Sequence, residues 1–108
     1  MHATVPDERG MLMRGPDAAR AGIEEAAILL SAMCNPVRLG VLRRLTEREW
    51  SVNELAADIQ LSQSALSQHL TKLRNARAVQ VRRERQHIFY SCDHAVVLRL
   101  LHELGLIN

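Results

Sequence analysis

Residues 53–76 read NELAADIQLSQSALSQHLTKLRNA, and this stretch decides the fold. Apolar residues recur at helical spacing in two segments, ELAADI and QSALSQHLTKLRNA, which are separated only by Gln60 and Leu61. Asn53 and Ser62 precede these segments and are residue types that cap helix N-termini. The pattern therefore predicts two short helices joined by a tight turn, which is the spacing of a helix-turn-helix unit.

The second of these helices, residues 62–76, has two chemically different faces. Leu66, Leu70 and Leu73 fall on one face and are expected in the core. The other face has no Asp or Glu, and in a helix-turn-helix unit such a face enters the major groove of DNA. Ordinary surface polarity is the alternative interpretation. Of this face, we expect Ser64, Ser67 and Gln68 to point towards the bases. The predicted DNA-binding residues of this helix are Gln63, Ser64, Ser67, Gln68, Thr71 and Lys72.

A β-hairpin is predicted directly after this helix. Residues 79–83 and 87–92 alternate apolar and polar side chains, and Glu84-Arg85-Gln86 links them. A basic hairpin in this position is typical of a wing that lies along the phosphates or probes the minor groove. Charged protection of an edge strand is the alternative. The predicted wing contacts to DNA are Arg82, Arg83, Arg85, Gln86 and His87.

Helical patterns also flank this central part. One helix is expected from an N-cap at Asp17, and a second from Asn35-Pro36 to about Glu47, since Pro suits the first helical position. Asp93 is expected to cap a last helix that is apolar around almost its whole circumference. Such a helix needs a second partner surface, because one core covers only one stripe. Residues 1–16 are interpreted as a flexible N-terminal arm, and residues 17–108 as one DNA-binding and dimerisation domain.

Composition narrows the class of protein further. The chain has 108 residues and a net charge of +2, but residues 62–92 alone carry Lys72 and five arginines against Glu84, a net +5. This local charge suits a polyanionic partner. Aromatic residues are only 3%, which disfavours a protein that binds single strands by stacking bases on aromatic rings.

We expect the protein not to be an enzyme, because no nucleophile–base set or phosphate loop is visible in the sequence. We also expect no cofactor or metal site. Without an apolar run or a signal sequence, a cytoplasmic protein is expected.

The segments LSAMCNPVRLGVLRRL and ELAADIQLSQSALSQHLTKLRNARAVQVRRERQHIFYS resemble the ArsR/SmtB family of bacterial winged-helix repressors. Residues 61–70 (LSQSALSQHL) and 35–39 (NPVRL) are particularly similar to the NolR branch of that family. The resemblance implies a mainly α winged helix-turn-helix fold in the order α-α-α-α-β-β-α. It also implies a homodimer through the first and last helices, which represses transcription from a pseudo-palindromic operator.

The sensor sites known in that family are not conveyed by the resemblance. Ala56 and Ala57 stand where its thiolate metal site has cysteines, and Ala95 and Leu106 stand where its terminal-helix metal site has histidines. The positions of its redox dithiol are Arg43 and Leu106.

Cys34 and Cys92 remain as candidate sensor residues. A thiol- or metalloid-responsive regulator that uses one or both of them is the alternative function. Their other interpretation is as small buried apolar residues. A protein-interaction winged helix without DNA readout is a further alternative, which the charge of residues 62–92 disfavours. The effector, if one exists, is left open by the sequence.

Overall fold

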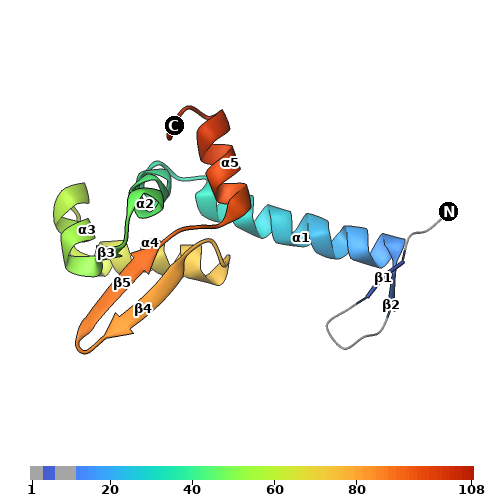
Figure 1. The fold of residues 1–108 in the computed structure, drawn as a ribbon, viewed down its shortest axis with the longest axis horizontal. Helices are drawn as coiled ribbons and strands as arrows, with labels where there is room; N and C mark the ends of the chain where they lie inside the picture. The colour runs from blue at the N-terminus through green and yellow to red at the C-terminus, as the bar shows by residue number, and fades with distance from the viewer. Residues whose placement is uncertain (1–3, 7–11) are drawn as a thin grey trace.

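A computed structural model describes residues 4–6 and 12–108 of the chain. The predicted order of four helices, a hairpin and a final helix is confirmed (Figure 1). Two short strands precede the first helix, and a third short strand lies between the second and third helices. The elements are β1 (Thr4–Pro6), β2 (Leu12–Arg14), α1 (Gly15–Met33), α2 (Pro36–Glu47), β3 (Trp50–Ser51), α3 (Val52–Ile59), α4 (Gln63–Asn75), β4 (Gln80–Glu84), β5 (His87–Ser91) and α5 (Ala95–Glu103).

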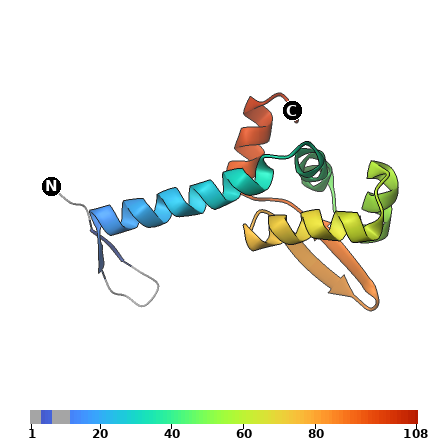
Figure 2. The same ribbon diagram turned by 180° about the vertical axis from the view of Figure 1, so that it is seen from behind.

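The start of the chain differs from the sequence-based expectation. Strands β1 and β2 pair antiparallel, and α1 begins at Gly15, before the predicted N-cap Asp17. The predicted arm, residues 1–16, falls partly on residues 1–3 and 7–11, which lie outside the described residues. Its flexibility and the division of the chain at residue 17 stay predictions. Figures 1 and 2 show α1 extending away from the body formed by the other helices and the hairpin.

The core lies where the apolar faces of α2, α3, α4 and α5 meet. The predicted leucine face of α4 is confirmed, because Leu66, Leu70 and Leu73 are all buried. They pack in one cluster with fully buried side chains from the other helices, among them Leu42, Leu55 and Leu101. Burial of side chains of this size is the main source of stability for a small domain.

The predicted hairpin belongs to a three-stranded antiparallel sheet in the order β3-β5-β4. Tyr90 of the central strand is buried and pairs with Trp50 on one side and Val81 on the other. The backbone N–H of Cys92 donates to the Leu45 carbonyl at 2.9 Å, which attaches the end of β5 to α2. The third strand matters because an isolated two-stranded hairpin is only marginally stable.

Two of the five predicted N-caps are confirmed with the expected geometry. The Asn35 side chain accepts a hydrogen bond from the backbone N–H of Arg38 at 3.1 Å, with Pro36 at the first helical position. The Ser62 hydroxyl accepts from the backbone N–H of Ala65 at 3.1 Å and begins α4. The polar and basic face of α4 therefore starts at the residue that the sequence indicates.

The N-cap predicted at Asn53 is wrong, and the cap of α3 is Ser51. Ser51 and Glu54 form a reciprocal capping box: the Ser51 hydroxyl accepts from the Glu54 N–H at 3.1 Å, and the Glu54 carboxylate accepts from the Ser51 N–H at 3.0 Å. The two bonds of the capping box satisfy more of the unpaired backbone N–H groups at the start of α3 than Asn53 alone could. The helix therefore begins earlier than predicted.

Asp93 is likewise not the cap of α5. The Nδ1 atom of His94 accepts from the backbone N–H groups of Val96 at 3.2 Å and Val97 at 3.4 Å. The extended backbone of His94 directs its ring over the first turn, so the helix starts one residue later than predicted.

The turn between α3 and α4 has the expected length and a left-handed residue. Gln60 adopts φ 66°, its N–H donates to the Ala57 carbonyl at 3.3 Å, and the Leu61 N–H donates to the Ala56 carbonyl at 3.0 Å. These are the two bonds of a Schellman motif, which ends a helix and redirects the chain at once. Glycine is not required, because Gln60 takes the left-handed conformation itself.

No single helix in the described part of the chain is long and apolar enough to cross a membrane; only α1 and α2 taken together meet that test, as a pair bent by 98°.

Replacing Ser51 by Ala is expected to lower the free energy of unfolding by about 1 kcal/mol, because the backbone N–H of Glu54 loses its acceptor. Thermal unfolding followed by circular dichroism should show a melting temperature about 4–8 °C lower. Asn53→Ala is the matched control and should cost clearly less. An equal or larger loss in the control would contradict the assignment of Ser51 as the cap.

Candidate nucleic-acid interface

The outward face of α4 is polar and carries no acid. All the residues of α4 that the sequence marks as DNA-binding are exposed: Gln63, Ser64, Ser67, Gln68, Thr71 and Lys72. Because Leu66, Leu70 and Leu73 are buried on the opposite side, the core fixes the rotation of this face about the helix axis. Ser64, Ser67 and Gln68 are thereby presented outwards from a rigid element.

Two of these side chains already have partners within the protein. The Gln63 amide donates to the Asn53 side-chain carbonyl of α3, and the Thr71 hydroxyl donates to the Ser67 carbonyl at 2.8 Å. The first bond joins the beginnings of the two helices and orients Gln63. Asn53, predicted only as a cap, is thus a residue of this surface. Its position ten residues before Gln63 gave no local signal, because the contact depends on the angle between α3 and α4.

The end of the wing is basic and open to solvent. Arg83, Arg85, Gln86 and His87 are all exposed. The register pairs Glu84 with His87, so the turn consists of Arg85 and Gln86 alone, and Arg85 adopts φ 57°. Figures 1 and 2 show this turn at the end of the body opposite α5.

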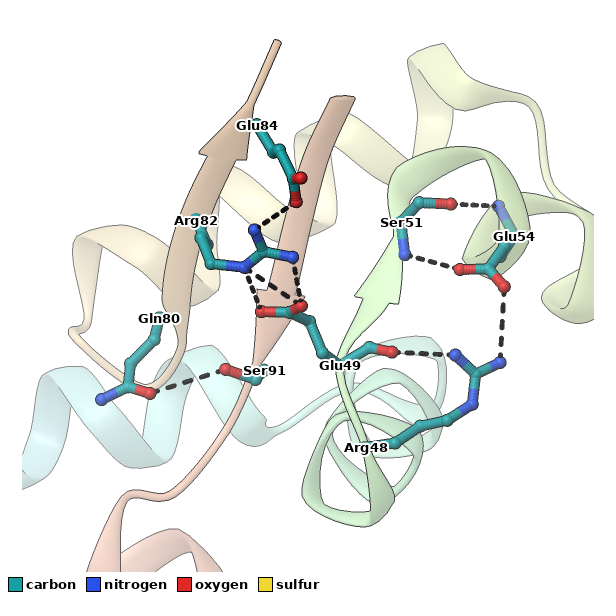
Figure 3. Close-up of polar contacts among 8 residues, drawn as sticks. All are labelled: Arg48, Glu49, Ser51, Glu54, Gln80, Arg82, Glu84 and Ser91. Carbon is teal, nitrogen blue, oxygen red and sulfur yellow. Dashed lines mark hydrogen bonds and ion pairs between the residues drawn. The ribbon is translucent and has the colours of Figure 1, made fainter. Parts of the chain in front are cut away.

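Arg82 differs from the other wing arginines because carboxylates surround its guanidinium (Figure 3). Its Nε and Nη2 atoms donate to the Glu49 carboxylate at 3.0 and 2.7 Å, and its Nη1 atom donates to Glu84 at 2.7 Å. Its Cζ atom also lies 4.6 Å from the centre of the Phe89 ring. The positive charge that the sequence assigns to DNA is therefore offset within the protein at this position.

A second arginine continues this polar network towards α3. Arg48 donates from Nη1 to the Glu49 carbonyl at 2.8 Å, and its Nη2 atom lies 3.7 Å from the Glu54 carboxylate. Its guanidinium stacks on Trp50, with Cζ 3.6 Å from the ring centre. Figure 3 shows an uninterrupted series of contacts from Arg82 on the wing to the capping box of α3.

Two carboxylates of this network, those of Glu49 and Glu54, are stabilised in their charged form. Hydrogen bonds from the Arg82 guanidinium lower the pKa of Glu49, and hydrogen bonds from the backbone and hydroxyl of Ser51 lower the pKa of Glu54. A carboxyl pKa that is lower in the folded than in the unfolded chain contributes stability above the ordinary carboxyl range. That contribution is lost as the pH falls through the folded-state pKa.

His69 is half-buried on α4, away from its outward face, so it packs within the protein rather than towards a partner. Its Nδ1 atom is buried without a hydrogen-bond partner among the described residues.

The two cysteines lie in different environments. Cys34 is exposed after α1, whereas Cys92 is buried and its thiol donates to the Ala78 carbonyl at 3.2 Å. Burial raises the pKa of the Cys92 thiol, which makes its nucleophilic thiolate scarcer. Within residues 4–6 and 12–108, no group of three or more His, Cys, Asp or Glu side chains is placed to hold a metal ion. These features do not favour a sensor that uses both thiols.

Comparisons with known proteins agree with this geometry. Residues 35–81 match the family model described as bacterial regulatory protein, arsR family. The nodulation protein NolR of Rhizobium meliloti is 47% identical over 90 residues, which cover 83% of this chain and 74% of that protein. The chain belongs to the arsR family. It is a DNA-binding transcriptional regulator of the winged helix-turn-helix class.

Other relatives in this family are named as regulators with opposite effects on transcription, one as an activator and one as a repressor. The transcriptional activator HlyU of Vibrio cholerae is 46% identical over 83 residues, covering 74% of this chain and 77% of HlyU. The biofilm growth-associated repressor of Agrobacterium fabrum is 41% identical over 80 residues, covering 74% of this chain and 68% of that repressor.

Solved structures of arsR-type regulators share the fold. The crystal structure of NolR from Sinorhizobium fredii superposes with a TM-score of 0.75 at 45% identity and covers 82% of this chain and 88% of that chain. A homodimeric winged helix-turn-helix domain from Mycobacterium bovis, solved by NMR, superposes with a TM-score of 0.75 at 26% identity and covers 83% of each chain.

Iodoacetamide is expected to label Cys34 and spare Cys92 in the folded protein at mildly alkaline pH, because only Cys34 is accessible. Mass spectrometry of the digested protein measures the two sites separately. Cys34→Ser should abolish labelling, Cys92→Ser should retain it, and denaturant should expose both thiols. Fast labelling of Cys92 in the folded wild type would contradict its buried placement.

Proposed function

We propose that this protein is a dimeric repressor that occupies a pseudo-palindromic operator through α4 and the wing. The observation that carries the proposal is the acid-free polar face of α4, held outwards by its buried leucines, together with an arginine-bearing wing tip. Repression follows from steric occupation of a promoter. The arsR family includes relatives named as repressors and as activators, so the direction of regulation is part of the proposal.

Base recognition is assigned to the middle of the α4 face. The major groove is about 12 Å wide and admits one helix. Gln68 can pair bidentately with adenine, and Ser64 and Ser67 can pair with several bases. Gln63, Thr71 and Lys72 lie where phosphate contacts are expected, and the N-terminus of α4 at Ser62 favours an anion through its free N–H groups.

The wing tip supplies phosphate contacts, which do not depend on the base sequence of the DNA. Arg83 and Arg85 are exposed, and no ion pair engages them among the described residues. Each is free to neutralise a phosphate, with Gln86 and His87 beside them as further hydrogen-bonding groups. Arg82 is not counted among these phosphate contacts, because its charge is already paired with Glu49 and Glu84.

Dimerisation is proposed through α1 and α5, the elements that hold the exposed large apolar residues. On α1, Ile23 is 69%, Ile28 is 56% and Leu30 is 53% exposed. Val96 of α5 is 45% exposed, and Leu104, the C-cap of α5, is 61% exposed. Large apolar side chains exposed on these two segments support an interaction site there. The related domain from Mycobacterium bovis is described as homodimeric, which supports a second copy as the partner.

A two-fold axis would repeat α4 about 34 Å along the duplex, one helical turn away. The proposed operator is therefore pseudo-palindromic. Such a protein acts on chromosomal DNA in the cytoplasm, and its role is regulatory rather than catalytic.

Gln68→Ala or Ser67→Ala is expected to weaken operator binding by about 1–3 kcal/mol and to spare random-sequence DNA, because each removes a base contact. Fluorescence anisotropy with an operator selected from a random duplex pool measures both affinities. Arg85→Ala is the comparison variant: it should weaken all duplexes and flatten the salt dependence. Equal losses on both kinds of DNA for Gln68→Ala would contradict base reading. A wild type that binds no duplex would indicate a protein-interaction winged helix instead.

Ile28→Asp is expected to give a folded monomer, because a charge at this exposed apolar position of α1 opposes pairing without disturbing the core. Analytical ultracentrifugation measures the mass, and circular dichroism checks the fold. Operator affinity should fall by about a hundredfold, since the second half-site no longer binds intramolecularly. Ile28→Leu, which keeps the apolar surface, should behave as wild type. A stable wild-type monomer would refute the dimer.

A further inference from the structure

Arg82 and Glu49 join two parts of the sheet that are not neighbours. Glu49 lies directly before β3, at one edge, and Arg82 lies in β4, at the other edge, 33 residues later. The strand β5 runs between them. The register places Phe89 of β5 opposite both Ser51 and Arg82, so these residues form one row across the sheet. Arg82 lies over the Phe89 ring and reaches the Glu49 carboxylate on the far side.

The chemistry of this cluster opposes a direct phosphate contact by Arg82. One guanidinium faces two carboxylates, Glu49 and Glu84, so the cluster is net negative and repels a phosphate. The bond to Glu49 uses two parallel N–H donors, the geometry that gives arginine–carboxylate pairs their directional strength. A third nitrogen of the guanidinium is engaged by Glu84. To contact DNA, Arg82 would have to leave both partners and the aromatic ring together.

The contacts on the other side of Glu49 lead into the helix-turn-helix unit. Arg48 bonds the Glu49 backbone carbonyl and lies beside Glu54 in the capping box of α3. The position of the wing is thus linked, through the side chains of Arg82, Glu49 and Arg48 and the backbone carbonyl of Glu49, to the helix that packs against α4 (Figure 3). The outer strand β4 has little else besides its pairing with β5 to hold it, since only Val81 among its side chains is even half-buried.

We propose that Glu49 is a positioning residue for DNA recognition, and that its clamp on Arg82 sets the wing relative to α4. Arg82 then acts within the protein, while Arg83 and Arg85 contact the phosphates. The clamp decides whether the wing and α4 meet one duplex together, so it contributes to the preference for operator over random DNA. This inference rests on the proposed DNA-binding function.

The test is a double-mutant cycle with Glu49→Gln, Arg82→Gln and the double variant. Two controls are matched: Arg83→Gln removes a neighbouring wing charge without a partner, and Glu47→Gln removes a nearby acid at the end of α2. Dissociation constants for the selected operator and for random duplex are measured over a range of KCl concentrations. Thermal unfolding of each variant is measured alongside.

Loss of the clamp should weaken operator binding roughly fivefold in either single variant, and the double variant should be no weaker, because one interaction is removed in all three. The slope of log affinity against log salt should stay as in wild type for Arg82→Gln and should flatten by about 0.9 for Arg83→Gln. Glu47→Gln should not lose operator preference. A flattened slope for Arg82→Gln, or tighter binding by Glu49→Gln, would overturn the proposal and make Arg82 a phosphate ligand screened by Glu49.

Hydrogen exchange of the free protein tests the clamp without DNA. In Glu49→Gln, the amides of β4 and β5 should exchange faster while the melting temperature stays near that of wild type. Unchanged exchange in the wing would overturn the clamp whatever the DNA data show. If the wild type bound no duplex at all, the proposed function would fail, and this measurement would still decide whether Glu49 holds the wing.

Discussion

Burial of one face of α4 is the constraint on which the proposed interface depends. Leu66, Leu70 and Leu73 are at most 1% exposed, so the helix cannot rotate about its axis without withdrawing leucines from the core. Removing a single buried leucine side chain typically costs about 2–5 kcal/mol, which is a large share of the stability of a small domain. The opposite face, which includes Ser67 and Gln68, is therefore directed outwards by the packing beneath it rather than by contacts of its own.

The wing is held in a different way, because it has almost no core of its own. Its central strand is fixed by the buried Tyr90, by pairing with β3 and by the backbone bond from Cys92 to α2. Its outer strand β4 is mostly exposed and depends on backbone pairing and on the contacts of Arg82. The proposed DNA-binding surface combines the rigid helix α4 with the weakly held wing, so the wing needs a contact that fixes its position relative to α4. Glu49 lies where it can provide that contact.

The single chain leaves large apolar residues of α1 and α5 exposed to solvent, without a partner that covers them among the described residues. Val97 and Leu101 of α5 are buried in the core, whereas Val96 of this helix and its C-cap Leu104 are exposed. A helix that is apolar around most of its circumference has one stripe more than its own core can cover. The wing tip lies at the end of the body opposite α5, so pairing through α5 would not cover it (Figure 1).

The sequence by itself determined the helices, their order, the hairpin and the outward face of α4. Helical period, strand alternation and caps such as Asn35 and Ser62 depend on residues a few positions apart, and such patterns are visible along the chain. Even so, Ser51 and His94 replaced the predicted caps Asn53 and Asp93, because several residues near each helix start were able to accept the bond. Only the tertiary structure decided that Arg82 pairs with Glu49, that Asn53 orients Gln63, and that Cys34 is open while Cys92 is buried. Each of these depends on how separate segments pack against one another, and no local pattern of residue types encodes the distance between them.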